Sequence, residues 1–454
     1  MKSIHRSSLL FSAALAFASP AASRSETVSS GLPHGSASAT SEELRTVGGA
    51  LRQARKQAQE SFEPIVERIV SCGPRALEVA FDVLVTEQIP EFQAGDSLQV
   101  LSQPQRDILL VALARFPHAN VRQHVRVQLA AAGTDSKTAL AAVRVFGAIG
   151  DARDLQRIAA LAPRKLEHAD TLTRVASESL RTATESILAR DPRAWVEIMD
   201  VVRTTDRSVA RSMLEAASAR RDPRALAVLS DGARTHRNLA PLCVAGSKKV
   251  GPSMDAGVAG DFVRWMVDEL PHARAEHRRG LYQAIGTLDD GTHARELIEG
   301  LQDADEPTRE SALWALRRLT GLGFGATPEP WWAWLESETR WNEGERASHR
   351  ADLESRDSVR VAAALRGYAG RLIWRESLAE EVAIVLERDE PQLRLLACEV
   401  LASLRAISAI RPMAYLLSAP EDSVREAAWR ALVMISGLEL PRDPEQAFER
   451  LHLL

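Results

Sequence analysis

Cysteine and aromatic side chains are scarce in this sequence. Three cysteines, Cys72, Cys243 and Cys398, are spread over 454 residues, and aromatic residues make up 5% of the chain. An odd number of widely spaced cysteines excludes a disulfide framework and a cysteine-based metal site, so each thiol is expected to be buried among apolar neighbours. Few aromatic residues disfavour a strand-rich protein, since strands are enriched in aromatic and β-branched side chains.

An excess of positive charge is also missing. Although 57 residues are basic, only six of them are lysines, and the formal net charge of the chain is −4. The arginine bias is typical of a genome rich in G and C. A nucleic-acid partner would need a basic excess to attract its phosphates, so we expect no nucleic-acid partner.

Long apolar runs and motifs of catalytic or metal sites are absent as well. A membrane helix needs roughly 20 apolar residues, and the apolar run from Leu9 to Ala18 is about half that length. No later run is long enough to span a membrane. The chain has no Gly-x-Ser-x-Gly, Cys-x-x-Cys or Ca²⁺-loop pattern, so no catalytic residue, cofactor or metal ion is predicted.

The first 24 residues have the pattern of a secretory signal. Lys2 and Arg6 precede the apolar run, and small residues suited to cleavage follow it. Residues 25–41 are rich in Ser, Gly, Ala and Thr, which predicts a disordered linker. We therefore expect an exported protein that is periplasmic or extracellular after cleavage of residues 1–24.

A long stretch near the C-terminus matches an earlier one at a fixed offset. The sequence from Asp305 to Gly321 corresponds to that from Glu421 to Gly437, 116 residues later. The match continues beyond the glycines, where Pro328 falls on Pro444. Self-similarity at a fixed offset predicts a repeat protein.

From residue 42 onward the chain is predicted to be almost entirely helical. Apolar residues recur at every third and fourth position, and helices of about 10–16 residues alternate with short links, which favours antiparallel helix pairs. A basic residue recurs every 31–37 residues through most of the chain, the period of an all-α solenoid. The expected parts are degenerate N-terminal units at 42–133, regular repeats at 134–320, a tryptophan-rich insertion at 321–356, and C-terminal repeats with a cap at 357–454.

The repeated pattern resembles the second helix of HEAT repeats. An acidic residue precedes a Val, Thr or Leu that is followed by Arg, Ala and Leu, as in Asp305 to Leu316 and Glu421 to Leu432. It looks most like the short bacterial HEAT repeats related to the helical repeats of bilin lyases. By this resemblance, turn carboxylates and helix arginines would form a ladder between repeats, with Asp357 beside Arg360 and Glu421 beside Arg425. The arginines assigned to this ladder are Arg211, Arg278, Arg309, Arg360, Arg394 and Arg425.

Five of the nine tryptophans lie between Trp314 and Trp341. Gly321 is expected to end one helix in the left-handed conformation, and Thr327 with Pro328 to begin the next. Two roles are open for the rings on that next helix: packing of the inserted helix, or an aromatic anchor for a protein partner. The residues proposed for partner binding are Trp331, Trp332, Trp334 and Trp341.

These patterns together favour a non-catalytic scaffold that binds a protein partner across an extended curved surface. Two alternatives stay open. One is an enzyme accessory or lyase-type helical repeat protein that binds a prosthetic group in a polar pocket. The other is a helical-repeat nucleic-acid binder, which would need a basic concave stripe.

Sequencing the N-terminus of the native protein tests export. We expect the mature chain to begin after Ala18, Ala21 or Ala22, because small residues follow the apolar run there. An intact Met1 on the native protein would contradict the prediction.

Overall fold

The computed structural model describes residues 41–56, 62–89, 99–133, 135–165, 168–250, 256–288 and 291–451. The predicted secretory signal and nearly all of the predicted linker lie outside the described residues. The described chain is all-α, with 24 α-helices and six short 3-10 helices, as the sequence predicts. None of the helices in these ranges is both long and apolar enough to cross a membrane.

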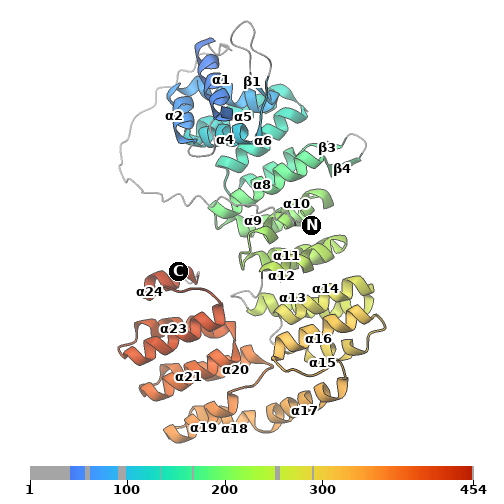
Figure 1. The fold of residues 1–454 in the computed structure, drawn as a ribbon, viewed down its shortest axis with the longest axis vertical. Coiled ribbons are helices and arrows are strands. Elements are labelled where there is room, and N and C mark those ends of the chain that lie inside the picture. Colours follow the sequence, from blue (N-terminus) through green and yellow to red (C-terminus); the bar gives the residue numbers. More distant parts are fainter. Residues whose placement is uncertain are drawn as a thin grey trace, which may run out of the picture.

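The helices follow one another with short links along the whole described chain (Figure 1). Up to residue 250 they are α1 (Ser41–Lys56), α2 (Glu63–Ser71), α3 (Pro74–Thr86), α4 (Gln103–Arg115), α5 (His118–Ala132), α6 (Ser136–Ile149), α7 (Asp154–Leu161), α8 (Arg174–Arg190), α9 (Ala194–Thr204), α10 (Arg207–Ala219), α11 (Ala225–Thr235), η1 (Arg237–Leu239) and α12 (Ala240–Val250).

The second half contains equally short elements. They are α13 (Ala256–Glu269), η2 (Leu270–His272), α14 (Ala275–Leu288), α15 (Ala294–Glu299), η3 (Gly300–Gln302), α16 (Glu306–Thr320), α17 (Pro328–Gly344), α18 (Arg346–Leu353), α19 (Ser358–Tyr368), α20 (Arg375–Ala383), η4 (Ile384–Glu387), α21 (Pro391–Leu404), η5 (Ile407–Ala409), α22 (Ile410–Tyr415), η6 (Leu416–Ser418), α23 (Asp422–Ser436) and α24 (Pro444–Arg450).

Two small hairpins interrupt the helices and were not predicted. Strand β1 (Gln88–Ile89) pairs with β2 (Gln99–Val100), and β3 (Arg164–Lys165) pairs with β4 (His168–Leu172), both antiparallel. Strands this short carry too few residues for the alternation that identifies a strand in a sequence. The prediction of an almost entirely helical chain from residue 42 is wrong at these two places.

Helix pairs stack in two layers, because each helix buries its apolar face against its neighbours in the stack. In one layer, α4, α6, α8, α10, α12, α14 and α16 each pack on the next. In the other layer, α7, α9, α11 and α13 do the same. Figure 1 shows these pairs descending from the N-terminal helices to α16. We call α1–α16 the first arm.

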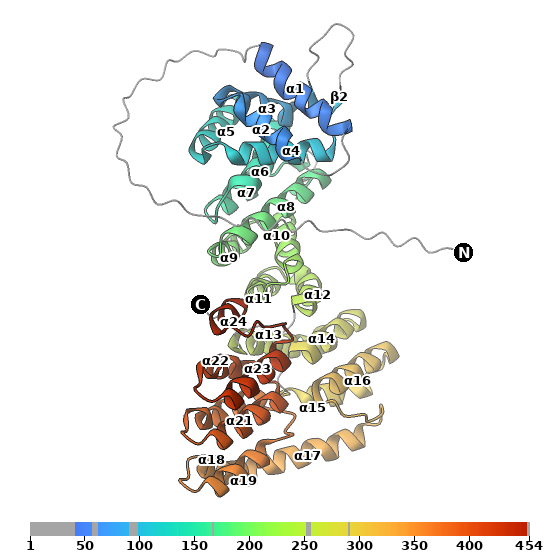
Figure 2. The same ribbon diagram turned by 60° about the vertical axis from the view of Figure 1, so that its left-hand side comes forward.

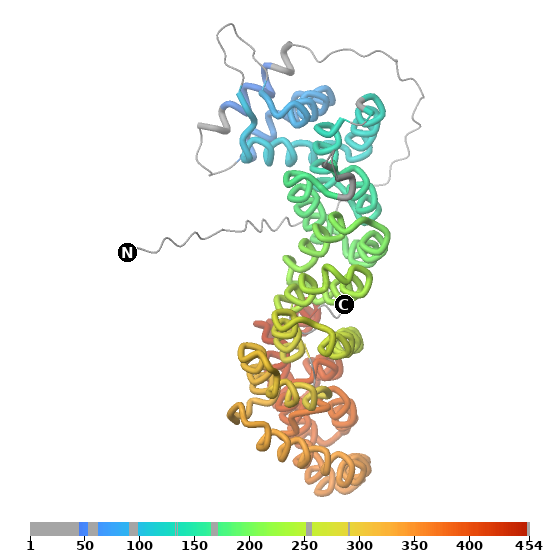
Figure 3. The backbone as a smooth tube through the Cα atoms, turned by 90° about the vertical axis from the view of Figure 1, so that its right-hand side faces the viewer, coloured from blue at the N-terminus to red at the C-terminus, as the bar shows by residue number. Residues whose placement is uncertain are grey.

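The chain reverses at α17. In Figures 1 and 2, α17 lies at the foot of the molecule, and α18–α24, the second arm, climb back beside the first arm until α24 lies level with α11 to α13. Figure 3 shows the molecule from the side, with the red second arm behind the yellow and green helices. The tryptophan-rich stretch 321–356 therefore contains α17, which connects the two arms, and α18, the first helix of the second arm.

The self-match in the sequence corresponds to a duplication in the structure. The first and last residues of α14, α15, η3 and α16 all differ by 116 from those of α21, α22, η6 and α23, and α17 and α24 begin at residues 116 apart. Helix boundaries that repeat without an insertion across this length mean that residues 275–335 and 391–451 are two copies of one unit. The copies lie in different arms.

The ends of the duplicated helices are built in the same way. Gly321 (φ 73°) and Gly437 (φ 66°) both end their helix in the left-handed conformation, as predicted for Gly321 and as glycine permits without a steric cost. The hydroxyls of Thr320 and Ser436 each donate to the carbonyl four residues earlier, at 2.7 Å. Thr327 does precede α17, although its side chain makes no capping hydrogen bond.

The cysteines are mainly interior residues. Cys243 and Cys398 are fully buried, and burial raises the pKa of each thiol to about 12. Cys72 is half-buried, with its thiol donating to the Arg68 carbonyl. The expectation of buried structural thiols is confirmed for the first two and is only partly met at Cys72.

Close packing of α14 on α16 gives a test of the first arm. A methyl group at Gly286 would lie 2.5 Å from the Ala315 Cα, so Gly286→Ala should lower the free energy of unfolding by about 1–3 kcal/mol. At Gly280 on the same helix the nearest atom is 3.8 Å away, so Gly280→Ala should raise it by up to about 1 kcal/mol. Urea denaturation followed by circular dichroism measures both, and equal effects would contradict this packing.

Candidate functional site

Two of the four tryptophans proposed for partner binding are interior residues. Trp331 is 0% exposed, its indole N–H donates to the Gly325 carbonyl at 2.8 Å, and its ring packs edge-on against Phe324. Trp341 is 3% exposed, and its ring contacts the His349 ring and the Arg371 guanidinium. Burial removes both rings from any partner surface, so the packing role left open for them is the correct one.

The other two proposed tryptophans are half-buried. The Trp332 ring lies under the Arg295 guanidinium, 5.4 Å from its centroid, and the Trp334 ring packs edge-on against Trp331. Each therefore presents only part of its ring to solvent. Both residues also pack against the core of the first arm.

Trp314, which was not among the proposed binding residues, is the most exposed tryptophan of the cluster, at 44%. It lies on α16, with the Arg318 guanidinium 5.6 Å from its ring centroid. A signal for its exposure is present in the self-match, because the position 116 residues later is Arg430, which is also exposed. An exposed arginine at the equivalent position of the other copy indicates that this position faces solvent.

Two of the predicted ladder arginines join neighbouring repeats. Arg278 on α14 pairs with Asp303 before α16 at 2.7 Å, and Arg394 on α21 pairs with Glu421 before α23 at 2.8 Å. The hydrogen bond from Arg278 holds the pKa of the Asp303 carboxyl below its usual value. The two arginines are equivalent residues of the two copies, but their acidic partners are not, since Asp303 corresponds to Ala419 and Glu421 to Asp305. Each arm therefore joins its repeats through the same arginine and a different turn carboxylate.

The remaining ladder arginines make contacts within their own repeat. Arg309 and Arg425 donate to the carbonyls of Asp303 and Ala419 in the preceding turn, and Arg211 pairs with Glu215 one helical turn away. Arg360 pairs with Asp352.

Both acid–arginine pairs that the resemblance implied are wrong in their partners. Asp357 accepts from the Val359 amide as a helix cap, and Glu421 pairs with Arg394 of the preceding repeat instead of Arg425. Each acid lies just before its helix, where the first free amides, or an arginine of the neighbouring repeat, are within reach.

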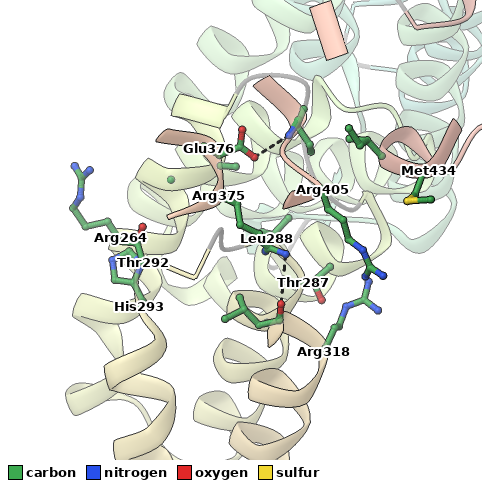
Figure 4. Close-up of a pocket in the computed structure, with 16 residues that line it drawn as sticks. Arg264, Thr287, Leu288, Thr292, His293, Arg318, Arg375, Glu376, Arg405 and Met434 are labelled. Atoms are coloured by element: carbon green, nitrogen blue, oxygen red, sulfur yellow. Dashed lines mark hydrogen bonds between the residues drawn. The ribbon is translucent and has the colours of Figure 1, made fainter. Parts of the chain in front are cut away.

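A cavity of about 470 Å³ lies between the two arms (Figure 4). The first arm supplies Arg264, His293 and Arg318, and the second arm supplies Arg375, Glu376 and Arg405. Among the described lining residues, four arginines therefore face a single carboxylate. The adjacent Asp289 and Asp290 lie outside the described residues.

The single carboxylate of the lining is already engaged. The two Glu376 oxygens accept the Ile407 and Ser408 amides, each at 2.9 Å, so this side chain anchors the start of η5. Arg375 donates across the arms to the Leu319 carbonyl at 3.4 Å. Figure 4 shows Arg318 and Arg405 extending from opposite arms with their guanidinium groups pointing toward each other.

Apolar contact next to the cavity joins the arms. Ile373 of the second arm packs against Ala294 and Leu319 of the first in a small buried cluster. Gly291, in the left-handed conformation at φ 99°, lies so close to Ile373 that an added Cβ would be 2.5 Å from it. Glycine at this position permits the arms to approach.

Comparisons with known proteins assign neither a family nor a function to this chain. No protein-family model matches the sequence, and no curated protein matches it. Among solved structures, an engineered protein from the Northeast Structural Genomics Consortium aligns with 87% of this chain and 96% of its own, at 14% identity and a TM-score of 0.31. A TM-score of this size does not establish a shared fold.

The different settings of two tryptophans predict different costs of removal. Trp331→Ala should lower the free energy of unfolding by about 3–5 kcal/mol, since a buried aromatic ring and its cavity are lost. Trp314→Ala should cost less than about 1 kcal/mol, because its ring is partly solvated. Chemical denaturation with hydrogen exchange at the α17 amides measures both, and similar losses would contradict these positions.

Proposed function

We propose that this chain is a HEAT-like α-solenoid that acts as an exported, non-catalytic scaffold for a protein partner. Support for the HEAT-like repeat comes from the arginine–carboxylate contacts between repeats, Arg278 with Asp303 and Arg394 with Glu421. Support for a binding role comes from the stacked layers, which offer a long surface on which many modest contacts can add up.

The observation that carries the binding role is the exposed Trp314 ring. It borders a hollow lined also by Glu310, Leu313, Arg317, Arg318, Gly321 and Arg405. Tryptophan and arginine are the residues most enriched among those that dominate binding energy at protein interfaces. An indole with solvated edges beside three guanidinium groups and one carboxylate has a net positive surrounding, which favours a partner surface that combines an apolar side chain with acidic groups.

Other exposed apolar side chains lie on the same layer of helices. Val111 on α4 and Val175 on α8 are each about half exposed, although they are large and apolar. Both border a second hollow of about 530 Å³ that Arg144 of α6 also lines. A partner that extends along this layer would cover apolar surface at both ends of the first arm.

One alternative also has a specific observation in its favour. An accessory protein that binds a small molecule needs a ligand-sized pocket with convergent polar groups, and pockets of about 300–1,000 Å³ serve this purpose. The cavity between the arms has that size and gathers five basic side chains. The nucleic-acid alternative is weaker, because the chain as a whole has a formal net charge of −4.

Affinity capture from the native host tests the scaffold role. Wild-type protein should recover a partner that Trp314→Ala recovers at least about tenfold less well, as expected when an interface anchor of about 1.4 kcal/mol or more is removed. The matched control is Tyr415→Ala, which removes an exposed aromatic ring from α22 of the second arm. Recovery unchanged by Trp314→Ala, or lost equally with Tyr415→Ala, would contradict an anchor at Trp314.

A further inference from the structure

We propose that the cavity between the two arms binds a small organic phosphate, whose phosphate group is held between Arg318 and Arg405. Arg318 and Arg405 also border the hollow beside Trp314, but this inference does not rest on the scaffold role, because it concerns a small ligand in the cavity and not a protein partner. In this site each arm supplies one of the two arginines that bind the phosphate group.

The charges in the cavity are the first argument. Arg318 and Arg405 point toward each other from opposite arms, and within the described residues neither pairs with a carboxylate (Figure 4). Two like charges held together disfavour the arrangement unless an anion lies between them. A phosphate monoester carries a charge of about −1.5 to −2 near neutral pH, which matches two guanidinium groups. A single carboxylate would leave one of them uncompensated.

The geometry of arginine also suits a phosphate. A guanidinium presents its N–H donors in a planar fork that can bind two oxygens of a phosphate at once. Arg375 is held nearby by its bond to the Leu319 carbonyl, and Glu376 is occupied by backbone amides. Glu376 therefore does not compete with a phosphate for Arg318 or Arg405.

The duplication supplies an independent argument. The two copies keep the arginines that support the fold, since Arg278 and Arg309 correspond to Arg394 and Arg425. The cavity positions differ instead: Arg318 corresponds to Met434, and Arg405 to Asp289. Helix packing alone would not require Arg318, because α23 has the same length as α16 with methionine at this position.

The backbone conformation of Arg405 also supports a binding site. This residue ends α21 with φ 55°, in the left-handed region where glycine is the usual helix-ending residue. A bulky side chain in this conformation is disfavoured, and such strain is concentrated at functional sites. The side chain that projects into the cavity from this position is the guanidinium that faces Arg318.

The rest of the lining indicates an organic ligand. Leu288 of the first arm and Ile407 and Ile435 of the second contribute apolar surface to the same cavity. Its volume of about 470 Å³ lies within the usual range for small-molecule sites, about 300–1,000 Å³. A ligand with an apolar body and one phosphate group would contact both the apolar and the basic side chains of this lining.

Calorimetric titration of the full chain with phenyl phosphate tests the proposal, with benzoate and inorganic phosphate as comparison probes. Phenyl phosphate should bind more tightly than either. Arg318→Gln and Arg405→Gln should each weaken its binding about tenfold or more, because each removes a charged hydrogen-bonding group. Arg366→Gln removes an exposed arginine of α19 outside the cavity and should change binding less than about twofold.

Further variants separate loss of the site from loss of the fold. Arg318→Gln should leave the melting temperature unchanged or raise it, because a repulsive pair is removed. If Arg318→Gln instead lowers the melting temperature, Arg318→Lys serves as a second variant. It keeps the charge and should bind phenyl phosphate with an affinity between those of wild type and Arg318→Gln. The proposal is overturned if wild-type protein does not bind phenyl phosphate, if benzoate binds equally well, or if Arg366→Gln weakens binding as much as the cavity variants.

Discussion

The arrangement of the whole molecule depends on α17, which belongs to two hydrophobic cores at once. Trp331 near its start is buried in the core of the first arm, and Trp341 near its end is buried in the core of the second. A rigid helix with a large buried ring at each end fixes how far apart the arms begin. The cavity, the contact between Ile373 and Leu319, and the facing arginines all follow from this placement.

The helices and their period could be predicted because repeat proteins are built from local contacts. The same pattern of small, apolar and basic residues is required wherever one helix pair packs on the next, so the match between Asp305 to Gly321 and Glu421 to Gly437 was visible without a structure. The glycine ends of α16 and α23 could be predicted for the same reason, since a left-handed residue after a helix is a local requirement.

The return of the second arm and the candidate site could not be predicted in this way. The contact of Ile373 with Ala294 and Leu319, like the approach of Arg318 and Arg405, joins residues that no sequence period relates. The tryptophans show the same limit. The sequence indicated the helix that carries these rings, but which of its faces is covered depends on two arms that a local pattern does not describe. Trp314 lies on a regular repeat helix, where the local pattern gives no sign of a binding residue.

The narrow connection between the arms has a mechanical consequence. Within the described residues, no helix of the second arm packs broadly on a helix of the first arm, and the buried contact between the arms is the small cluster around Ile373. Each arm is stiff because its helices are closely stacked. The two arms therefore resemble two rigid bodies joined by a hinge near α17. A small rotation at α17 and Ile373 would be multiplied with distance and become largest at α24. The stiffness of the molecule against opening is therefore set by a few side chains at the hinge, and not by the many that fill the arms.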